Sequence, residues 1–168
     1  SNLFFAQKSE YTVTTISDSL KNNANAVIRL SDITITISSQ NAMIITTKVV
    51  TTVLNEFGLR NLNLSENYDK NRKVSKIEAI AYDAFGKELK SFRKKDFKDV
   101  SVADGISIFN DNRVLYLDYT PTVYPFTMVY ESQIETSNTA FIPSWSPVDD
   151  YYVSTENTKL TISFKPEL

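Results

Sequence analysis

The sequence predicts an all-β fold, an antiparallel β-sandwich with at most one or two short helices. Apolar and polar residues alternate over many short segments, as they do in half-buried strands, whereas helical periodicity is almost absent. β-Branched and aromatic residues fill these segments, and turn-forming residues separate them. A chain of 168 residues is long enough to bury one core, so we expect a single domain over residues 7–168. A closed barrel is the alternative architecture.

The clearest local unit is a predicted hairpin from Lys76 to Phe92, around which we expect the other strands to assemble. Residues 83–87 form its turn. Asp83 can accept hydrogen bonds from backbone N–H groups there, and Gly86 can adopt the positive φ that such a turn requires.

The amino-terminal half predicts a brief helix and a second hairpin. Ser17 and Asp18 suit a helix start, as N-cap and first-turn acid. Alternating Ile and Thr mark residues 32–37 as a half-buried strand. Residues 26–30 lead into this strand, and residues 43–54 return as a long strand after a polar loop. We expect residues 61–71 to be irregular.

The carboxyl-terminal half predicts further strands separated by loops. Residues 91–102 are charged with single aromatic anchors, which indicates a surface connection with a possible helical turn. A turn is expected at Asp104-Gly105. Strands are predicted over residues 113–119, 126–134, 151–154 and 159–165.

Two residue types are missing from the sequence, and this restricts its chemistry. The chain has no cysteine and no histidine, which excludes thiolate nucleophiles and removes the commonest general base and metal ligand. We therefore expect no catalytic residue, no metal site and no cofactor. With 18 basic and 20 acidic residues, the surface does not favour nucleic acid. No segment approaches the roughly 20 apolar residues of a membrane span.

The first and last residues suggest a piece of an exported protein. Residues 1–6 end in an apolar run closed by Ala6, which resembles the end of a signal peptide; a tag remnant or a buried strand is the alternative. The chain stops directly after a predicted strand, so we expect the natural protein to continue beyond Leu168.

Several short motifs, each weak alone, occur in a distinctive order. They lie at residues 24–27, 53–58, 68–70, 82–87, 104–105, 111–113, 124–125, 129–131 and 143–145. Together they resemble the domain of unknown function 3857, which precedes transglutaminase-like domains in secreted bacterial proteins, especially those of the Bacteroidetes group. The resemblance covers residues 24–164.

This resemblance implies a β-sandwich at the amino terminus of an exported protein, which would be periplasmic, associated with the outer membrane or extracellular. It also implies that a transglutaminase-like domain with a papain-like cysteine protease fold follows as the partner of this chain. That domain would use a Cys-His-Asp arrangement, so the enzymatic part is expected elsewhere in the protein. The family's activity is undefined, and no catalytic residue carries over.

Three functions follow as hypotheses. The first is a non-catalytic accessory domain that packs against the downstream domain. The alternative is a carbohydrate- or peptide-binding module that uses Trp145, Tyr151 and Tyr152, since aromatic side chains on a stiff loop lose little entropy on binding. Trp145 stands between Pro143 and Pro147, and its simpler role would be to close one end of the sandwich. A hydrolase based on two carboxylates is a third hypothesis, but no such pair is recognisable from spacing.

Overall fold

The structure is a computed structural model, which describes residues 10–102, 111–148 and 150–167. The predicted signal remnant and the turn at Asp104-Gly105 lie outside these residues. The described strands are β1 (Ala26–Ser39), β2 (Ala42–Val53), β3 (Ser65–Tyr68), β4 (Arg72–Tyr82), β5 (Glu88–Arg93), β6 (Lys98–Ser101), β7 (Arg113–Tyr116), β8 (Phe126–Thr136), β9 (Val153–Thr155) and β10 (Thr158–Phe164). The helical elements are η1 (Val13–Thr15), α1 (Asp18–Lys21), η2 (Glu56–Asn61) and η3 (Lys94–Asp96). The predicted all-β class with few short helices is confirmed.

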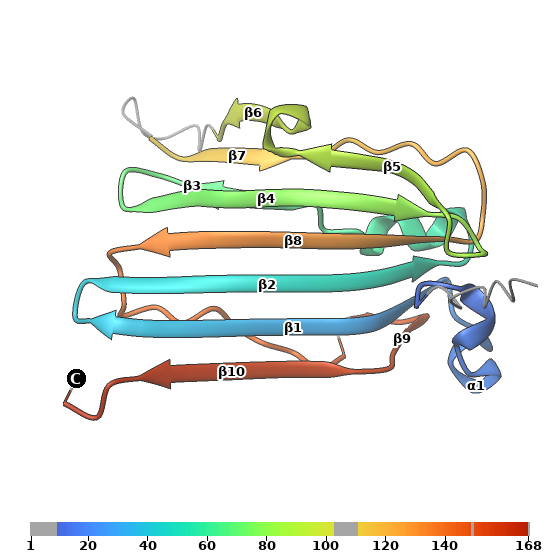
Figure 1. The fold of residues 1–168 in the computed structure, drawn as a ribbon, viewed down its shortest axis with the longest axis horizontal. Coiled ribbons are helices and arrows are strands. Elements are labelled where there is room, and N and C mark those ends of the chain that lie inside the picture. Colours follow the sequence, from blue (N-terminus) through green and yellow to red (C-terminus); the bar gives the residue numbers. More distant parts are fainter. Residues whose placement is uncertain (1–9, 103–110, 149, 168) are drawn as a thin grey trace, which may run out of the picture.

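The strands form a large sheet and a small one (Figure 1). The large sheet has the order β10-β1-β2-β8-β4-β5, and β9 also pairs with β1; the small sheet has the order β3-β7-β6. Most pairings are antiparallel as predicted, but β9 and β10 both run parallel to β1. The difference arises because the chain crosses from β8 to the far side of β1 through a long connection, as parallel pairing requires.

The predicted hairpin forms as β4 and β5, but at an edge of the large sheet, and β2 and β8 occupy its centre. Its turn has the expected chemistry. Asp83 Oδ1 accepts hydrogen bonds from the Phe85 and Lys87 backbone N–H groups, both at 2.9 Å, and Gly86 has φ 78°. Turn chemistry is local and readable from sequence, whereas the place of a hairpin depends on pairings between distant segments.

The core lies between the two sheets. Ile35 and Ile45 of the large sheet are buried with Leu64 and Leu115, which come from the small sheet and the segment before it. Ile33 and Ile37 pack against this core, as the alternation in residues 32–37 predicted. A second, smaller cluster of Ile16, Ala24 and Val27 joins the amino-terminal segment to β1. No helix of the described segments is long and apolar enough to cross a membrane.

Three local predictions were incomplete. The brief helix forms at Asp18–Lys21, but the Ser17 side chain makes no capping bond to the backbone and its hydroxyl lies 2.9 Å from that of Ser19. Residues predicted to be irregular contain β3, and part of the charged connection forms β6. These two strands have four residues each, too few for a clear alternation.

The two short strands are joined across β7 by polar side chains. The Tyr68 hydroxyl donates to Asp99 Oδ2 at 2.8 Å, and Arg113 Nε lies 2.9 Å from Asp99 Oδ1. The hydrogen bond from Tyr68 and the Arg113 guanidinium lower the pKa of Asp99 below its usual value. The small sheet is therefore held by cross-strand contacts between residues far apart in sequence.

Another group of charges gives a testable pH dependence. Glu131 on β8 lies 2.9 Å from Lys76 Nζ and 3.1 Å from Lys48 Nζ. The hydrogen bond from Lys76, followed by that from Lys48, lowers the pKa of Glu131 below its usual value of 4.5. Because the folded-state pKa is the lower one, the ionised carboxylate stabilises the fold above about pH 4.5, and this stabilisation is lost as the pH falls through the lowered folded-state pKa.

We expect Glu131→Gln to lower the urea midpoint at pH 7 and to converge with the wild type toward pH 3. Urea unfolding at a series of pH values measures this. Glu135→Gln on the same strand is the matched control and should leave the pH profile unchanged. Parallel profiles for wild type and Glu131→Gln would contradict the prediction.

Candidate functional site

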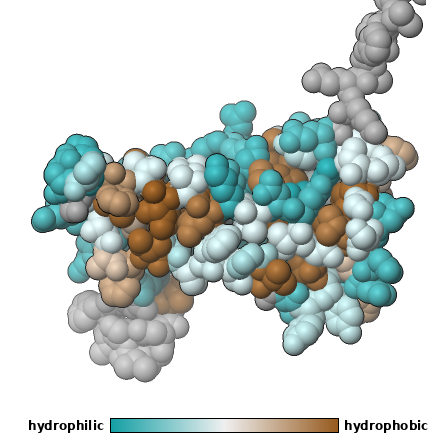
Figure 2. Space-filling model, turned by 90° about the horizontal axis from the view of Figure 1, so that it is seen from below, coloured by the Kyte–Doolittle hydropathy of each residue, from teal (hydrophilic) through white to brown (hydrophobic). Residues whose placement is uncertain are grey.

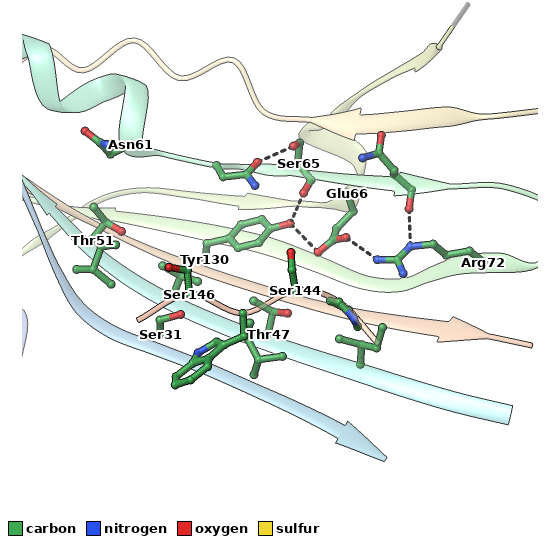
Figure 3. Close-up of a pocket in the computed structure, with 18 residues that line it drawn as sticks. Ser31, Thr47, Thr51, Asn61, Ser65, Glu66, Arg72, Tyr130, Ser144 and Ser146 are labelled. Atoms are coloured by element: carbon green, nitrogen blue, oxygen red, sulfur yellow. Dashed lines mark hydrogen bonds and ion pairs between the residues drawn. The ribbon is translucent and has the colours of Figure 1, made fainter. Parts of the chain in front are cut away.

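A groove of about 490 Å³ lies on the face of the large sheet that the small sheet covers only in part (Figure 3). β1, β2 and β8 form its floor. One wall comes from the end of η2, from β3 and from Arg72; the other is the loop of residues 143–146 in the connection between β8 and β9. The groove volume falls in the usual range of ligand sites.

The floor owes its polar character to alternation along β2. Successive residues of a strand point to opposite faces, so Ile45, Thr47, Val49 and Thr51 share the groove side. Ile45 also belongs to the core, whereas Thr47 and Thr51 bring hydroxyl groups to the floor. Ser31 of β1 adds another. Hydroxyl groups here alternate with aliphatic side chains on a face that is elsewhere apolar.

Glu66 on β3 anchors one wall to the floor. Its Oε1 accepts a hydrogen bond from the Ser132 hydroxyl at 2.6 Å, and its Oε2 lies 3.3 Å from Arg72 Nη2. The Tyr130 hydroxyl lies 3.5 Å from Glu66 Oε1. Burial, and then the Glu66 charge, raise the pKa of Tyr130 well above its usual value of 10, so the phenol remains a hydrogen-bond donor at pH values where an ordinary tyrosine ionises.

The free edge of β3 faces the groove, and side chains already bond to two of its carbonyl groups. Tyr130 donates to the Ser65 carbonyl oxygen at 3.2 Å, and Arg72 Nε donates to that of Asn67 at 2.9 Å (Figure 3). β3 pairs with β7 on its other side. This wall therefore presents its side chains, rather than these two carbonyl groups, to a molecule in the groove.

The structure places the three predicted contact residues in two different regions. Trp145 lines the groove with 39% of its surface exposed, and its Nε1 donates to the Thr158 hydroxyl at 3.1 Å. Tyr151 and Tyr152 are more exposed but do not line it. The Tyr152 carbonyl accepts from Asn25 N, whereas Thr158 is aligned with Ser31. Asn25, which contacts Tyr152, and Ser31, which is aligned with the Trp145 partner Thr158, therefore lie roughly 20 Å apart along the chain, at about 3.3 Å per residue.

Several groove residues could not be singled out from the sequence. Glu66 lies in a segment predicted to be irregular, Arg72 begins β4 only six residues later, and Tyr130 belongs to β8, far along the chain. Arg72 meets Glu66 across the short connection between β3 and β4, whereas Tyr130 reaches Glu66 only because the small sheet packs over β8. The single signal available was the alternation of Thr with Val along residues 43–54.

The residues of the groove give little support to a hydrolase that uses two carboxylates. Glu66 is the only carboxylate among the described residues that line it, and this side chain is already bound to Ser132 and Arg72. In the described ranges, no group of three or more acidic side chains is placed to hold a metal ion. The arrangement suits binding through hydroxyl, amide and aromatic groups.

The fold and groove define an all-β domain built from two unequal sheets. The model of the family DUF3857, a domain of unknown function with a solved structure, matches residues 39–168. The chain therefore belongs to this family, and the resemblance drawn from the motifs is confirmed. The match begins at the last residue of β1, so the motif at residues 24–27 lies outside it.

Several solved structures resemble this chain to different degrees. A Parabacteroides distasonis protein described as a "putative protease" has a TM-score of 0.63 and 12% identity, over 85% of this chain and 29% of its own. An M1 zinc metallopeptidase from Deinococcus radiodurans has a TM-score of 0.30 at 12% identity, over 75% of this chain and 23% of its own. Native yeast LTA4 hydrolase has a TM-score of 0.32 at 11% identity, over 68% and 15%.

The first of these similarities shows a shared fold, and the other two are too weak to support an argument. This chain spans 29% of the length of the Parabacteroides protein. The comparison with curated proteins found no match.

Proposed function

We propose that this chain is a non-catalytic accessory domain of a longer exported protein, in which it packs against and supports a transglutaminase-like domain. The observation that best supports this proposal is the exposure of four large apolar side chains, two on β10 and two in the connection between β8 and β9. We name Phe141, Ile142, Ile162 and Phe164 the β10 patch.

The side chains of the β10 patch expose much of their surface although all four are apolar. Phe141 and Phe164 expose 74% and 64% of their surface, and Ile142 and Ile162 expose 46% and 39%. Parallel pairing sets Ile162 beside Ile35 and Phe164 beside Ile37, so these two side chains continue the apolar face of the core. Figure 2, which looks onto the β10 edge, shows hydrophobic side chains gathered there. Such patches mark protein interaction sites.

Two further observations support an accessory role. The sequence has no cysteine or histidine, so a Cys-His-Asp arrangement would have to come from another domain. The residues that carry the family resemblance serve structural contacts: Asp83 and Gly86 form a turn, and Asn55 Nδ2 donates to Asn25 Oδ1 at 3.0 Å. A domain attached after residue 168 would begin close to Phe164, so it could cover the patch.

The test uses the natural full-length protein with the double substitution Phe141→Asp and Phe164→Asp. We expect the neighbouring domain to melt roughly 3 to 8 °C lower in calorimetry, since lost docking of 1 to 2 kcal/mol shifts Tm by a few degrees. The matched control is Phe57→Asp with Phe85→Asp, whose side chains are 66% and 80% exposed but lie outside the patch. In the isolated 168-residue chain, neither pair should change Tm. Equal effects of both pairs on the full-length protein would reject the proposal.

Ligand binding is a second candidate, and a separate feature supports it. Trp145 is neither fully buried nor placed as a plug at one end of the sandwich; it lies beside the groove. This function is compatible with an accessory role, because the groove and the β10 patch share no residue.

A further inference from the structure

We infer that the groove binds a neutral oligosaccharide, with Trp145 as the stacking residue and the hydroxyl and amide side chains of the floor and walls as hydrogen-bonding groups. The inference rests on the charge balance of the groove, on the blocked edge of β3 and on the position of Trp145. It is independent of docking at the β10 patch.

Charge is the first argument for a neutral ligand. Glu66 and Arg72 are the only charged side chains among the described residues that line the groove, and they pair at 3.3 Å. Glu66 is also held by Ser132. An anionic or cationic ligand would displace these partners and leave one charge uncompensated in a partly buried site, which is costly. A neutral ligand leaves the ion pair intact.

The blocked edge of β3 distinguishes a sugar from a peptide. An extended peptide that binds beside a sheet gains most of its affinity from main-chain hydrogen bonds to a free strand edge. Here the carbonyl groups of Ser65 and Asn67 are occupied by Tyr130 and Arg72. Two of the acceptors that a peptide would need on this edge are therefore already bonded inside the protein, and side-chain groups remain for the ligand.

The remaining groups suit a polyhydroxylated molecule. Thr47 and Ser31 supply hydroxyls from the floor, where Thr51 is only 2% exposed, and Asn61 and Asn63 supply amides from one wall. Hydroxyl and amide groups both donate and accept, as sugar hydroxyls do. Val49 between the two threonines gives an apolar surface for the C–H groups of a sugar ring.

Trp145 supplies the aromatic surface opposite these polar groups. Its indole N–H is bound to Thr158, and it stands in a loop between Pro143 and Pro147, so the ring is held before a ligand arrives. A ring fixed in this way loses little conformational entropy on binding. With 39% of its surface exposed, the ring retains area for stacking.

The test is a glycan array carrying neutral, sialylated and sulfated glycans, followed by calorimetric titration with the strongest neutral binder. We expect binding to neutral oligosaccharides and at least tenfold weaker binding for Trp145→Ala. The matched control is Tyr151→Ala, an aromatic residue that is 85% exposed in the same connection but outside the groove; its affinity should equal the wild type.

Thr47→Val provides a second variant that keeps the side-chain shape and removes one floor hydroxyl. We expect it to weaken binding about three- to tenfold with an unchanged Tm, so it decides the question if Trp145→Ala fails to fold. Binding limited to charged glycans, no glycan binding, binding of an extended-peptide library instead, or equal losses in Trp145→Ala and Tyr151→Ala would each overturn the inference.

Discussion

Gly58→Ala is expected to destabilise the domain by about 3 kcal/mol, because a methyl group at this position has no space. An ideal Cβ on Gly58 would lie 2.2 Å from the Asn25 carbonyl oxygen and 2.8 Å from its carbon. These are backbone atoms, and the same oxygen accepts a hydrogen bond from Leu54 N at 2.9 Å. Relief of the clash would require η2 to move away from the start of β1.

Equilibrium unfolding in urea measures this loss. Gly86→Ala is a useful comparison, because Gly86 needs its positive φ in an exposed turn and the substitution should cost about 1 to 2 kcal/mol. A Gly58→Ala protein as stable as the wild type would show that η2 and the start of β1 are not packed as described.

The second large effect is expected at Phe126, the first residue of β8. Its side chain is 0% exposed, and its ring centroid lies 5.5 Å from that of Tyr119 and 5.7 Å from that of Tyr124. Phe126→Ala removes this ring and leaves a cavity, which should cost about 4 kcal/mol. Since a domain of this size is stable by about 5 to 15 kcal/mol, the variant should be only marginally folded.

Urea denaturation followed by circular dichroism tests the prediction. The control is Phe164→Ala, which truncates a phenylalanine that is 64% exposed and should change the stability of the isolated chain by no more than about 0.5 kcal/mol. Equal losses at the two positions would mean that Phe126 is not part of the central core.

These two residues also show what the sequence could and could not predict. Phe126 belongs to a strand that alternation identified almost to its ends, and Gly58 lies in a motif that supported the family resemblance. The reason for glycine at position 58 is its contact with Asn25, more than thirty residues earlier, which no local pattern encodes. Local hydrogen bonding could be predicted, as at Asp83, because its partners are two and four residues away.

The sheet topology and the groove could not be predicted from local sequence patterns, for the same physical reason. Strands β9 and β10 have ordinary strand sequences, and nothing in them reveals that their partner is β1 or that the pairing is parallel. Glu66 and Arg72 lie six residues apart, but the hydrogen bonds that join Glu66 and Ser65 to Ser132 and Tyr130 exist only after the sheets pack. Trp145 could be identified from its prolines, but its separation from Tyr151 and Tyr152 depends on the register of β1 with β9 and β10.

The parallel pairing of β10 with β1 also has a consequence while the chain is synthesised on the ribosome. About 120 residues separate the end of β1 from the start of β10 (positions 39 and 158), which corresponds to roughly 6 to 24 s of translation. During this interval the edge of β1 that β10 later covers presents unpaired backbone N–H and C=O groups. Until β10 emerges, this edge can pair with another chain, which makes the nascent protein prone to aggregation.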